Sequence, residues 1–243
     1  MLNSISNLKK ITFLIHFLIF SSSIFLIWQM LSRADLPIKE IMIKGQYDSI
    51  DSEQIHLIAN KYLIGNFFTI NLKSTQNAFK KLPWIRDVSV RRKWPDKLLI
   101  TIEEHNVLAR WGNLGLVNNY GEIFNAAFQD DLPVFNGDEK FVMDITKKYY
   151  EINKILSKEL IQVGTISLSN RLSWEIVTDN QLKIILGQDN VLKKISLFIT
   201  HYQDVLFKVK KRIEYVDLRY KDGFSVKVIN ESSRKFKKEK IIL

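Results

Sequence analysis

The sequence predicts an α+β protein held in a membrane by one N-terminal helix, with two soluble modules after it. Three observations predict this class. Residues 11–31 contain no charged side chain. The next stretch of about 70 residues shows the order strand, helix, helix, strand, strand. Beyond it, hairpin patterns alternate with amphipathic helices, which predicts an antiparallel sheet with helices packed on one face.

Composition sets limits on the function. Hydrophobic residues make up 46% of the 243 residues, enough for a real core. The chain has no cysteine, which excludes disulfides, thiolate metal sites and a cysteine nucleophile. The net charge is +10, with basic runs at residues 208–212 and 234–240. These runs fit a solvated surface with a basic tail, or attraction to anionic lipid or another polyanion.

The membrane helix is expected over residues 11–32. Twenty-one uncharged residues at about 1.5 Å each span roughly 32 Å, close to the ~30 Å hydrocarbon core of a bilayer. A cleaved signal peptide is disfavoured, because its apolar region is shorter and ends in small residues. Lys9 and Lys10 favour a cytoplasmic tail, residues 1–10, and a single-pass type II orientation. His16 fits a helix-contact residue better than a functional site.

The first soluble module covers residues 37–105. A short strand ends at Gly45, and Asp51 and Asn71 are candidate N-caps of two helices. Pro83 stops the second helix. Two strands with alternating apolar residues then flank a turn at Trp94, and they form a hairpin.

The second module covers residues 106–230 and is followed by a basic flexible tail, residues 231–243. A helix is expected over residues 144–160. Residues 172–186 read as a hairpin, and residues 192–206 as an amphipathic helix that packs on the sheet rather than forming a coiled coil. A last hairpin turns at residues 221–223, where Gly223 suits a turn.

Several stretches carry a family resemblance. LPWIRDVSVRRKWPDKLLITIEE (residues 82–104) and GNFFTINL (residues 65–72) look like parts of an FtsQ-type POTRA domain. HNVLARW, LVNNYGEIF and YVDLRYKDG continue the match. Family members usually have proline where Asn106 stands, a small departure. The chain therefore resembles the FtsQ/DivIB family of bacterial cell-division proteins over nearly its whole length, which implies a POTRA domain (β-α-α-β-β) and then a C-terminal β domain.

No catalytic constellation is visible in the sequence. The four histidines are far apart, and adjacent Glu103 and Glu104 would point to opposite faces of a strand. There is no HExxH, GxSxG or phosphate-binding glycine loop. We therefore expect no enzyme activity, no cofactor, no metal and no small-molecule substrate.

The resemblance implies a non-catalytic scaffold of the divisome. It would sit in the cell inner membrane at the division septum, with its bulk in the periplasm. Its partners would be FtsB- and FtsL-type division proteins and other divisome proteins, besides the lipid bilayer around residues 11–32. Nucleic acid is excluded as a partner, because the anchor places the basic residues outside the cytoplasm.

The expected partner site lies in the last hairpin, where a strand of the partner would be added at a free sheet edge. It consists of Arg219, Tyr220, Gly223, Phe224 and Val226. Arg219 and Tyr220 match family positions at the partner contact, and we assign them ion pairing and an amphipathic anchor, respectively. The alternative for both is ordinary strand surface.

Two other functions stay open. A POTRA domain also serves proteins of outer-membrane assembly and secretion, but these carry a large barrel, which about 120 further residues cannot supply. An envelope enzyme acting on the cell wall is the other alternative, and a polar cleft would favour it.

Overall fold

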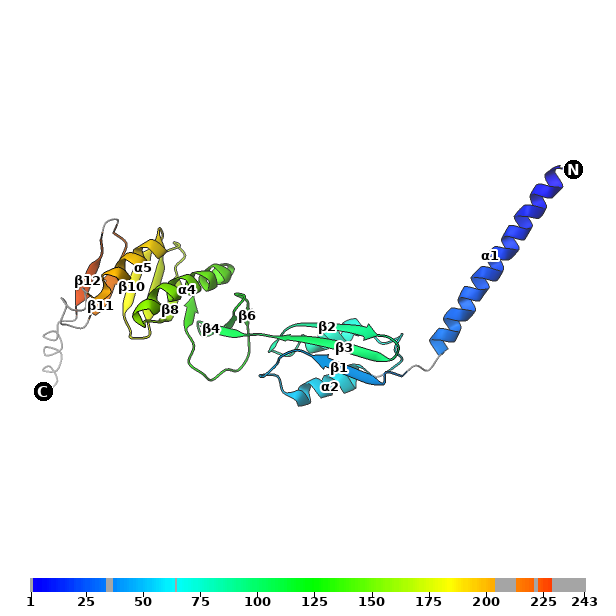
Figure 1. Ribbon diagram of the computed structural model, residues 1–243, viewed down its shortest axis with the longest axis horizontal. Coiled ribbons are helices and arrows are strands. Elements are labelled where there is room, and N and C mark those ends of the chain that lie inside the picture. Colours follow the sequence, from blue (N-terminus) through cyan, green and yellow to red (C-terminus); the bar gives the residue numbers. More distant parts are fainter. Residues whose placement is uncertain (1, 34–36, 64, 204–212, 221–222, 229–243) are drawn as a thin grey trace, which may run out of the picture. The chain divides into compact units, whose positions relative to one another are not determined.

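The structure is a computed structural model that describes residues 2–33, 37–63, 65–203, 213–220 and 223–228. The chain divides into two compact units, Met1–Glu104 and His105–Leu243, here called the first and the second unit. Figure 1 labels most of their helices and strands. The predicted tail at residues 231–243 and the basic run at residues 208–212 lie outside the described residues.

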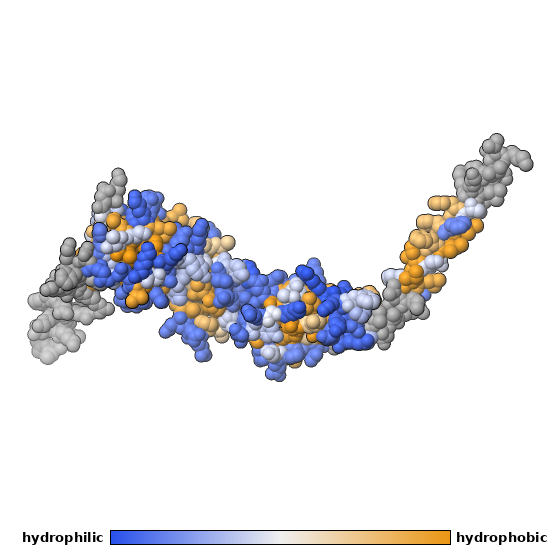
Figure 2. All heavy atoms as spheres, viewed as in Figure 1, coloured by the Kyte–Doolittle hydropathy of each residue, from blue (hydrophilic) through white to orange (hydrophobic). Residues whose placement is uncertain are grey.

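Helix α1, Leu2–Arg33, contains the predicted membrane segment. Its part Thr12–Gln29 is long and apolar enough to cross a membrane and is not buried against the rest of the protein, and Figure 2 shows mostly hydrophobic atoms there. Two of its polar side chains bond within the helix: Ser23 Oγ donates to the carbonyl of the residue four before it, at 2.8 Å, and His16 Nδ1 lies 2.7 Å from such a carbonyl. The helix therefore fits a single-pass membrane anchor.

The soluble part of the first unit has the predicted order β-α-α-β-β. Strand β1 lies beside β3 in parallel, and β2 lies on the other side of β3, antiparallel to it. Figure 1 shows this small sheet with its helices. The elements are β1 Glu40–Lys44, α2 Ser52–Tyr62, α3 Leu72–Phe79, β2 Ile85–Lys93 and β3 Lys97–Glu104.

Both predicted helix caps are confirmed. The Asp51 side chain accepts the Glu53 backbone N–H at 2.9 Å, and Asn71 accepts that of Ser74 at 3.0 Å. These bonds satisfy donors that the first turn of a helix leaves free. The helices cover one sheet face, over a core centred on fully buried side chains: Phe79, Leu98 and Ile100.

The second unit is built on one nine-stranded sheet, in the order β12-β11-β10-β9-β8-β7-β4-β5-β6. Helices α4, Val142–Leu156, and α5, Val191–Thr200, pack on it. They agree with the helices predicted from residues 144 and 192, although residues 204–206 lie outside the described part. Two short 3-10 helices, Glu139–Phe141 and Ser157–Glu159, flank α4. The strands are β4 Val107–Trp111, β5 Gly115–Asn118, β6 Ile123–Phe124, β7 Val134–Asn136, β8 Val163–Leu168, β9 Trp174–Thr178, β10 Lys183–Gly187, β11 Ile213–Asp217 and β12 Ser225–Val228.

The α+β class is confirmed, but the second sheet is mixed and not purely antiparallel. The pairs β4–β7, β7–β8 and β10–β11 are parallel. The helices explain two of these pairs: α4 connects β7 to β8, and α5 lies between β10 and β11, so each carries the chain back over the sheet before the next strand starts. No helix precedes the third pair, because the chain passes from β6 to β7 through residues 125–133. The core under these helices contains fully buried residues of several elements: Phe135, Ile145, Ile152, Ile176 and Phe198.

Candidate protein-interaction site

Strand β12 forms one end of the nine-stranded sheet. It pairs with β11 alone among the described strands, in antiparallel register from Asp217↔Ser225 to Ile213↔Val228. Its outer side therefore presents backbone N–H and C=O groups that no described strand uses. An edge of this kind can accept an added strand.

Lys227 marks the exposed face of this edge. Its ammonium lies 3.3 Å from a carboxylate oxygen of Glu214 and 5.4 Å from the ring centre of Tyr215, both on β11. Lysine on an edge strand is a common device against unspecific pairing with other chains. The charge therefore disfavours unspecific pairing at this edge.

Two of the predicted site residues, Phe224 and Val226, pack inward. The Phe224 ring meets the Phe198 ring of α5 edge-on at 5.6 Å, and both predicted residues lie against the core of the second unit. They hold β12 on the sheet, so they can reach a partner chiefly through their backbone. Gly223 is half-buried just before the strand.

Arg219 is held by a carboxylate of its own chain. Its Nε and Nη2 donate to Asp217 at 2.9 and 2.6 Å, and its backbone N–H donates to the same carboxylate at 3.0 Å. The Asp217 side chain is only 7% exposed, whereas that of Arg219 is 60% exposed. These hydrogen bonds hold the pKa of Asp217 below its usual value, and the carboxylate raises the pKa of Arg219.

The position of Arg219 and Tyr220 differs from the predicted strand. Strand β11 ends at Asp217, and the Leu218 N–H still bonds to Ile185 on β10 at 2.8 Å. Arg219 and Tyr220 follow in the loop before β12, because Asp217 takes the next backbone N–H into a side-chain turn. Tyr220 is 58% exposed, so its ring is accessible beside the edge.

Sequence reasoning missed the role of Asp217, which orients Arg219. A local signal existed, since aspartate commonly accepts the backbone N–H two residues on and so starts a turn. Gly187 at the end of β10 also belongs to this arrangement. It has φ +78°, and a Cβ there would lie 3.2 Å from the Arg219 Cγ, so the arginine stem lies directly over the glycine.

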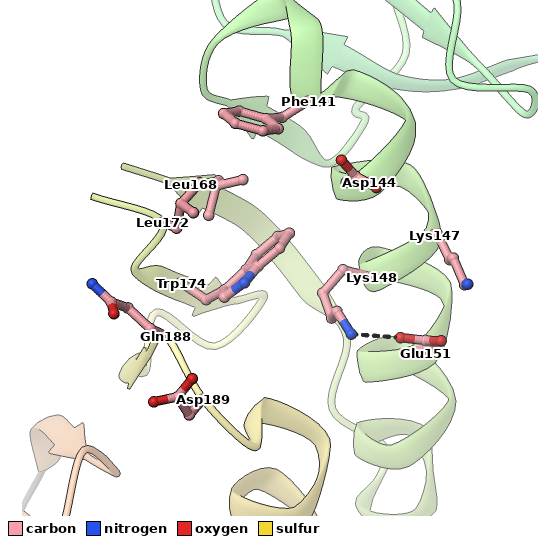
Figure 3. Close-up of a pocket in the computed structure, with 10 residues that line it drawn as sticks. All are labelled: Phe141, Asp144, Lys147, Lys148, Glu151, Leu168, Leu172, Trp174, Gln188 and Asp189. Atoms are coloured by element: carbon pink, nitrogen blue, oxygen red, sulfur yellow. Dashed lines mark hydrogen bonds and ion pairs between the residues drawn. The ribbon is translucent and has the colours of Figure 1, made fainter. Parts of the chain in front are cut away.

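A separate pocket of about 510 Å³ lies between α4 and the β8–β9 hairpin. Figure 3 shows Trp174 pointing toward α4 and Lys147 pointing away from the pocket. Lys148 and Glu151 of α4 form an ion pair at 2.8 Å in its wall. The described residues include no group of three or more histidine, cysteine, aspartate or glutamate side chains placed to hold a metal ion.

A helix that fits a membrane anchor, a β-α-α-β-β module and a C-terminal sheet with a partly open edge together indicate a POTRA protein. Comparison of the sequence with protein families identifies which POTRA proteins this chain resembles. The model of the FtsQ-type POTRA domain matches residues 36–105, and that of the C-terminal part of the cell division protein FtsQ/DivIB matches residues 109–219. The chain belongs to the FtsQ/DivIB family of bacterial cell-division proteins.

Similar proteins from other bacteria support the same family assignment. Cell division protein FtsQ of Neisseria gonorrhoeae is 35% identical over 193 residues, which cover 79% of this chain and 80% of that protein. FtsQ of Neisseria meningitidis is 34% identical over 81% of this chain and 84% of its own, and FtsQ of Nitrosospira multiformis is 34% identical over 79% and 84%. The protein thus belongs to a family of cell-division proteins, which is not known as a family of enzymes.

Proposed function

We propose that this protein is a non-catalytic, membrane-anchored scaffold of the divisome. Its short N-terminal tail would lie in the cytoplasm and its two soluble units in the periplasm, at the division septum. Its partners would be FtsB- and FtsL-type division proteins, bound through the second unit. Family membership, the anchor-like helix α1 and the open edge at β12 support this proposal.

Strand addition at β12 is the proposed mode of binding, and the position of β12 at the end of the sheet is the observation that carries it. A partner segment laid along β12 would satisfy the outward backbone groups and extend the sheet by one strand. The contact of Phe224 with Phe198 of α5 holds β12 in place before a partner binds, so less conformational entropy is lost on binding.

The loop next to the edge would supply the side-chain contacts. β12 has only four residues, which limits the hydrogen bonds that a partner can gain from it. Tyr220 offers an accessible ring, and Arg219 offers a guanidinium already fixed by Asp217. Tyrosine and arginine are enriched among residues that dominate interface energies, and a fixed side chain loses less entropy on binding.

The affinity of the full-length protein for its FtsB-type partner tests the loop. Tyr220→Ala should weaken this affinity about 30-fold, the effect of losing a hot-spot residue of about 2 kcal/mol. Tyr150→Ala is the matched control, since Tyr150 is a tyrosine of similar exposure on α4. An unchanged affinity for Tyr220→Ala would contradict the role of the loop.

Backbone methylation of the partner tests strand addition itself. Peptides of the FtsB-type partner can be N-methylated at alternate residues, in two sets shifted by one position. In an added strand, only every second N–H points to β12, so one set should lose binding and the other should keep it. Equal binding by both sets would show that the partner is not held as a strand.

Depletion of the protein in its host tests the cellular role. Long filaments without completed septa are expected for a division scaffold. Normal septation with a loss of outer-membrane proteins would instead favour the outer-membrane assembly role that other POTRA proteins serve.

A further inference from the structure

One end of the first unit carries a highly exposed aromatic side chain. Trp94, in the turn between β2 and β3, is 80% exposed, whereas no other described aromatic side chain outside α1 exceeds 58%. A tryptophan left this open in water exposes a large apolar ring and an indole N–H. Side chains of this kind are enriched at the interfaces of membranes with water.

The Trp94 turn lies at the end of the small sheet at which β1 begins, as Figure 1 shows. The Lys39 N–H donates to the Asp96 carbonyl at 3.0 Å, and the Lys39 ammonium binds the Asp96 carboxylate at 3.0 Å. Strand β1 then starts at Glu40 opposite Lys97. The turn is thus fixed to the first residues that follow the anchor.

A second apolar side chain lies at the same end. Phe68 is 44% exposed in the loop between α2 and α3. Arg92 of β2 ties this loop to the Trp94 turn, because its guanidinium donates to the backbone carbonyls of Phe67, Phe68 and Ile70 at 2.6 to 3.1 Å. A bridge between Pro37 and the residue after Gly65 fixes the loop to the incoming chain as well.

Two exposed cations on one face of β2 precede Trp94. Arg91 and Lys93 are exposed on the outer face of β2, and the Lys93 ammonium lies near a methionine sulfur, at 3.9 Å. Among the described contacts, neither has a carboxylate partner. Five cations of β1–β3 and their connections lie at this end, against two carboxylates, Glu40 and Asp96, which pair with Lys97 and Lys39. The cations are Lys39, Arg91, Arg92, Lys93 and Lys97. The end of the sheet that carries Trp94 and Phe68, with Arg91 and Lys93 on the face of β2 turned away from the Phe68 loop, is here called the basic aromatic tip.

The covalent chain keeps the basic aromatic tip close to a membrane. Helix α1 ends at Arg33, and Lys39 is already bonded to the Trp94 turn. Six residue steps of at most about 3.6 Å span no more than roughly 22 Å. The tip is therefore always within reach of the lipid surface from which α1 emerges.

We propose that the basic aromatic tip docks on the surface of the bilayer that holds α1. Trp94 and Phe68 enter the headgroup layer, and Arg91 and Lys93 lie against anionic lipid phosphates. This inference requires α1 to be a membrane anchor, but it is independent of partner binding at β12.

The test measures how close the tip comes to lipid in the full-length protein, reconstituted in nanodiscs with and without phosphatidylglycerol. The chain has no cysteine, so Thr69→Cys beside the tip and Gln46→Cys after β1 can each carry one fluorophore. Spin-labelled headgroups should quench the label at residue 69 strongly in anionic discs and the label at residue 46 weakly. High salt should reduce the stronger signal.

Variants of the tip identify the contact. Trp94→Ala should remove most of the quenching at residue 69, and Lys93→Glu should lower the ratio of docked to free protein about fivefold or more. Lys81→Glu, an exposed lysine after α3, is the charge-matched control and should change nothing. Thermal unfolding of each variant checks that the first unit remains folded.

Several results would overturn the proposal. Equal quenching at both label positions, or quenching that is independent of anionic lipid, would exclude docking by the tip. Quenching unaffected by Trp94→Ala, together with weaker co-purification of another division protein, would assign the surface to a protein partner instead. The affinity for the FtsB-type partner, measured on the same Trp94→Ala variant, should stay unchanged, so failure here is distinguishable from failure of the β12 site.

Discussion

Arg219→Ala tests whether the ion pair between Arg219 and Asp217 stabilises the β11–β12 hairpin that carries the proposed partner site. It removes two charge-assisted hydrogen bonds from Asp217 and leaves this carboxylate, only 7% exposed, with the backbone N–H of residue 219 as the remaining described donor. The loop that carries Tyr220 starts at this contact, so its order depends on the pair.

The size of the effect follows from the burial of the two partners. An exposed ion pair contributes about 0.2–1 kcal/mol, and leaving a buried polar group unsatisfied costs about 1–3 kcal/mol. Because the Asp217 carboxylate is buried and Arg219 is exposed, we expect a loss of about 1–2 kcal/mol in the local stability of the β11–β12 hairpin. At 1.4 kcal/mol per factor of ten, this equals about 5- to 30-fold faster amide exchange there.

Amide hydrogen exchange of the full-length protein measures the local stability of the β11–β12 hairpin directly. The amides of β11 and β12 should exchange faster in Arg219→Ala, whereas those of β2 and β3 should not change, since the first unit has its own core. Arg219→Lys should recover only part of the protection, because lysine cannot form the paired hydrogen bonds of a guanidinium. Exchange in β11 and β12 within twofold of the original protein would refute the reasoning.

The Asp217–Arg219 pair also predicts how the stability of the β11–β12 hairpin depends on pH. The pKa of Asp217 is lowered in the folded protein, so its contribution is fully present above the ordinary aspartate pKa of about 3.9 and is lost as the pH falls through the folded value. Asp217→Asn should therefore lower hairpin protection equally at pH 7 and pH 5. The difference from the original protein should shrink only below about pH 4.

Three further substitutions test packing and backbone geometry. Phe198→Ala should cost the second unit about 3–5 kcal/mol, whereas Leu197→Ala on the exposed side of α5 should cost little, as thermal unfolding would show. Gly187→Ala should cost about 1–2 kcal/mol through its positive φ and displace the Arg219 stem, visible as faster exchange in β11 and as a loss of partner affinity. Phe79→Ala should unfold the first unit and leave exchange in the second unit unchanged, because their cores are separate; a joint transition would contradict this.

The local elements could be predicted from the sequence because their signals are local. The caps at Asp51 and Asn71 are each followed by the helix that they start. The predicted hairpin at residues 172–186 is present as β9 and β10, which begin at Trp174 and are joined by a turn at Asp179. Capping, alternation and turn formation depend on neighbours within a few residues, so one sequence is enough to reveal them.

The candidate site was only partly predictable, because its contacts cross the sheet. Residues 224 and 226 belong to the predicted last strand, but nothing local shows that Phe224 meets Phe198 on a helix about 25 residues earlier. The parallel pairs of the second sheet likewise join strands that are separated by whole helices. Strand order is set by such long-range packing, which alternation along one strand does not encode.

The brevity of β12 also bears on how the free protein avoids self-association. Strand β10, on the other side of β11, is more apolar: Ile184 and Leu186 are fully buried, and Lys183 is its one charged side chain. The β11–β12 hairpin covers the outer side of β10, so a chain shortened before Ile213 would expose the backbone groups of β10 as a longer edge with three large apolar side chains. Such a fragment should associate through this edge more readily than the intact chain, whose edge strand has only four residues, among them a serine and a lysine.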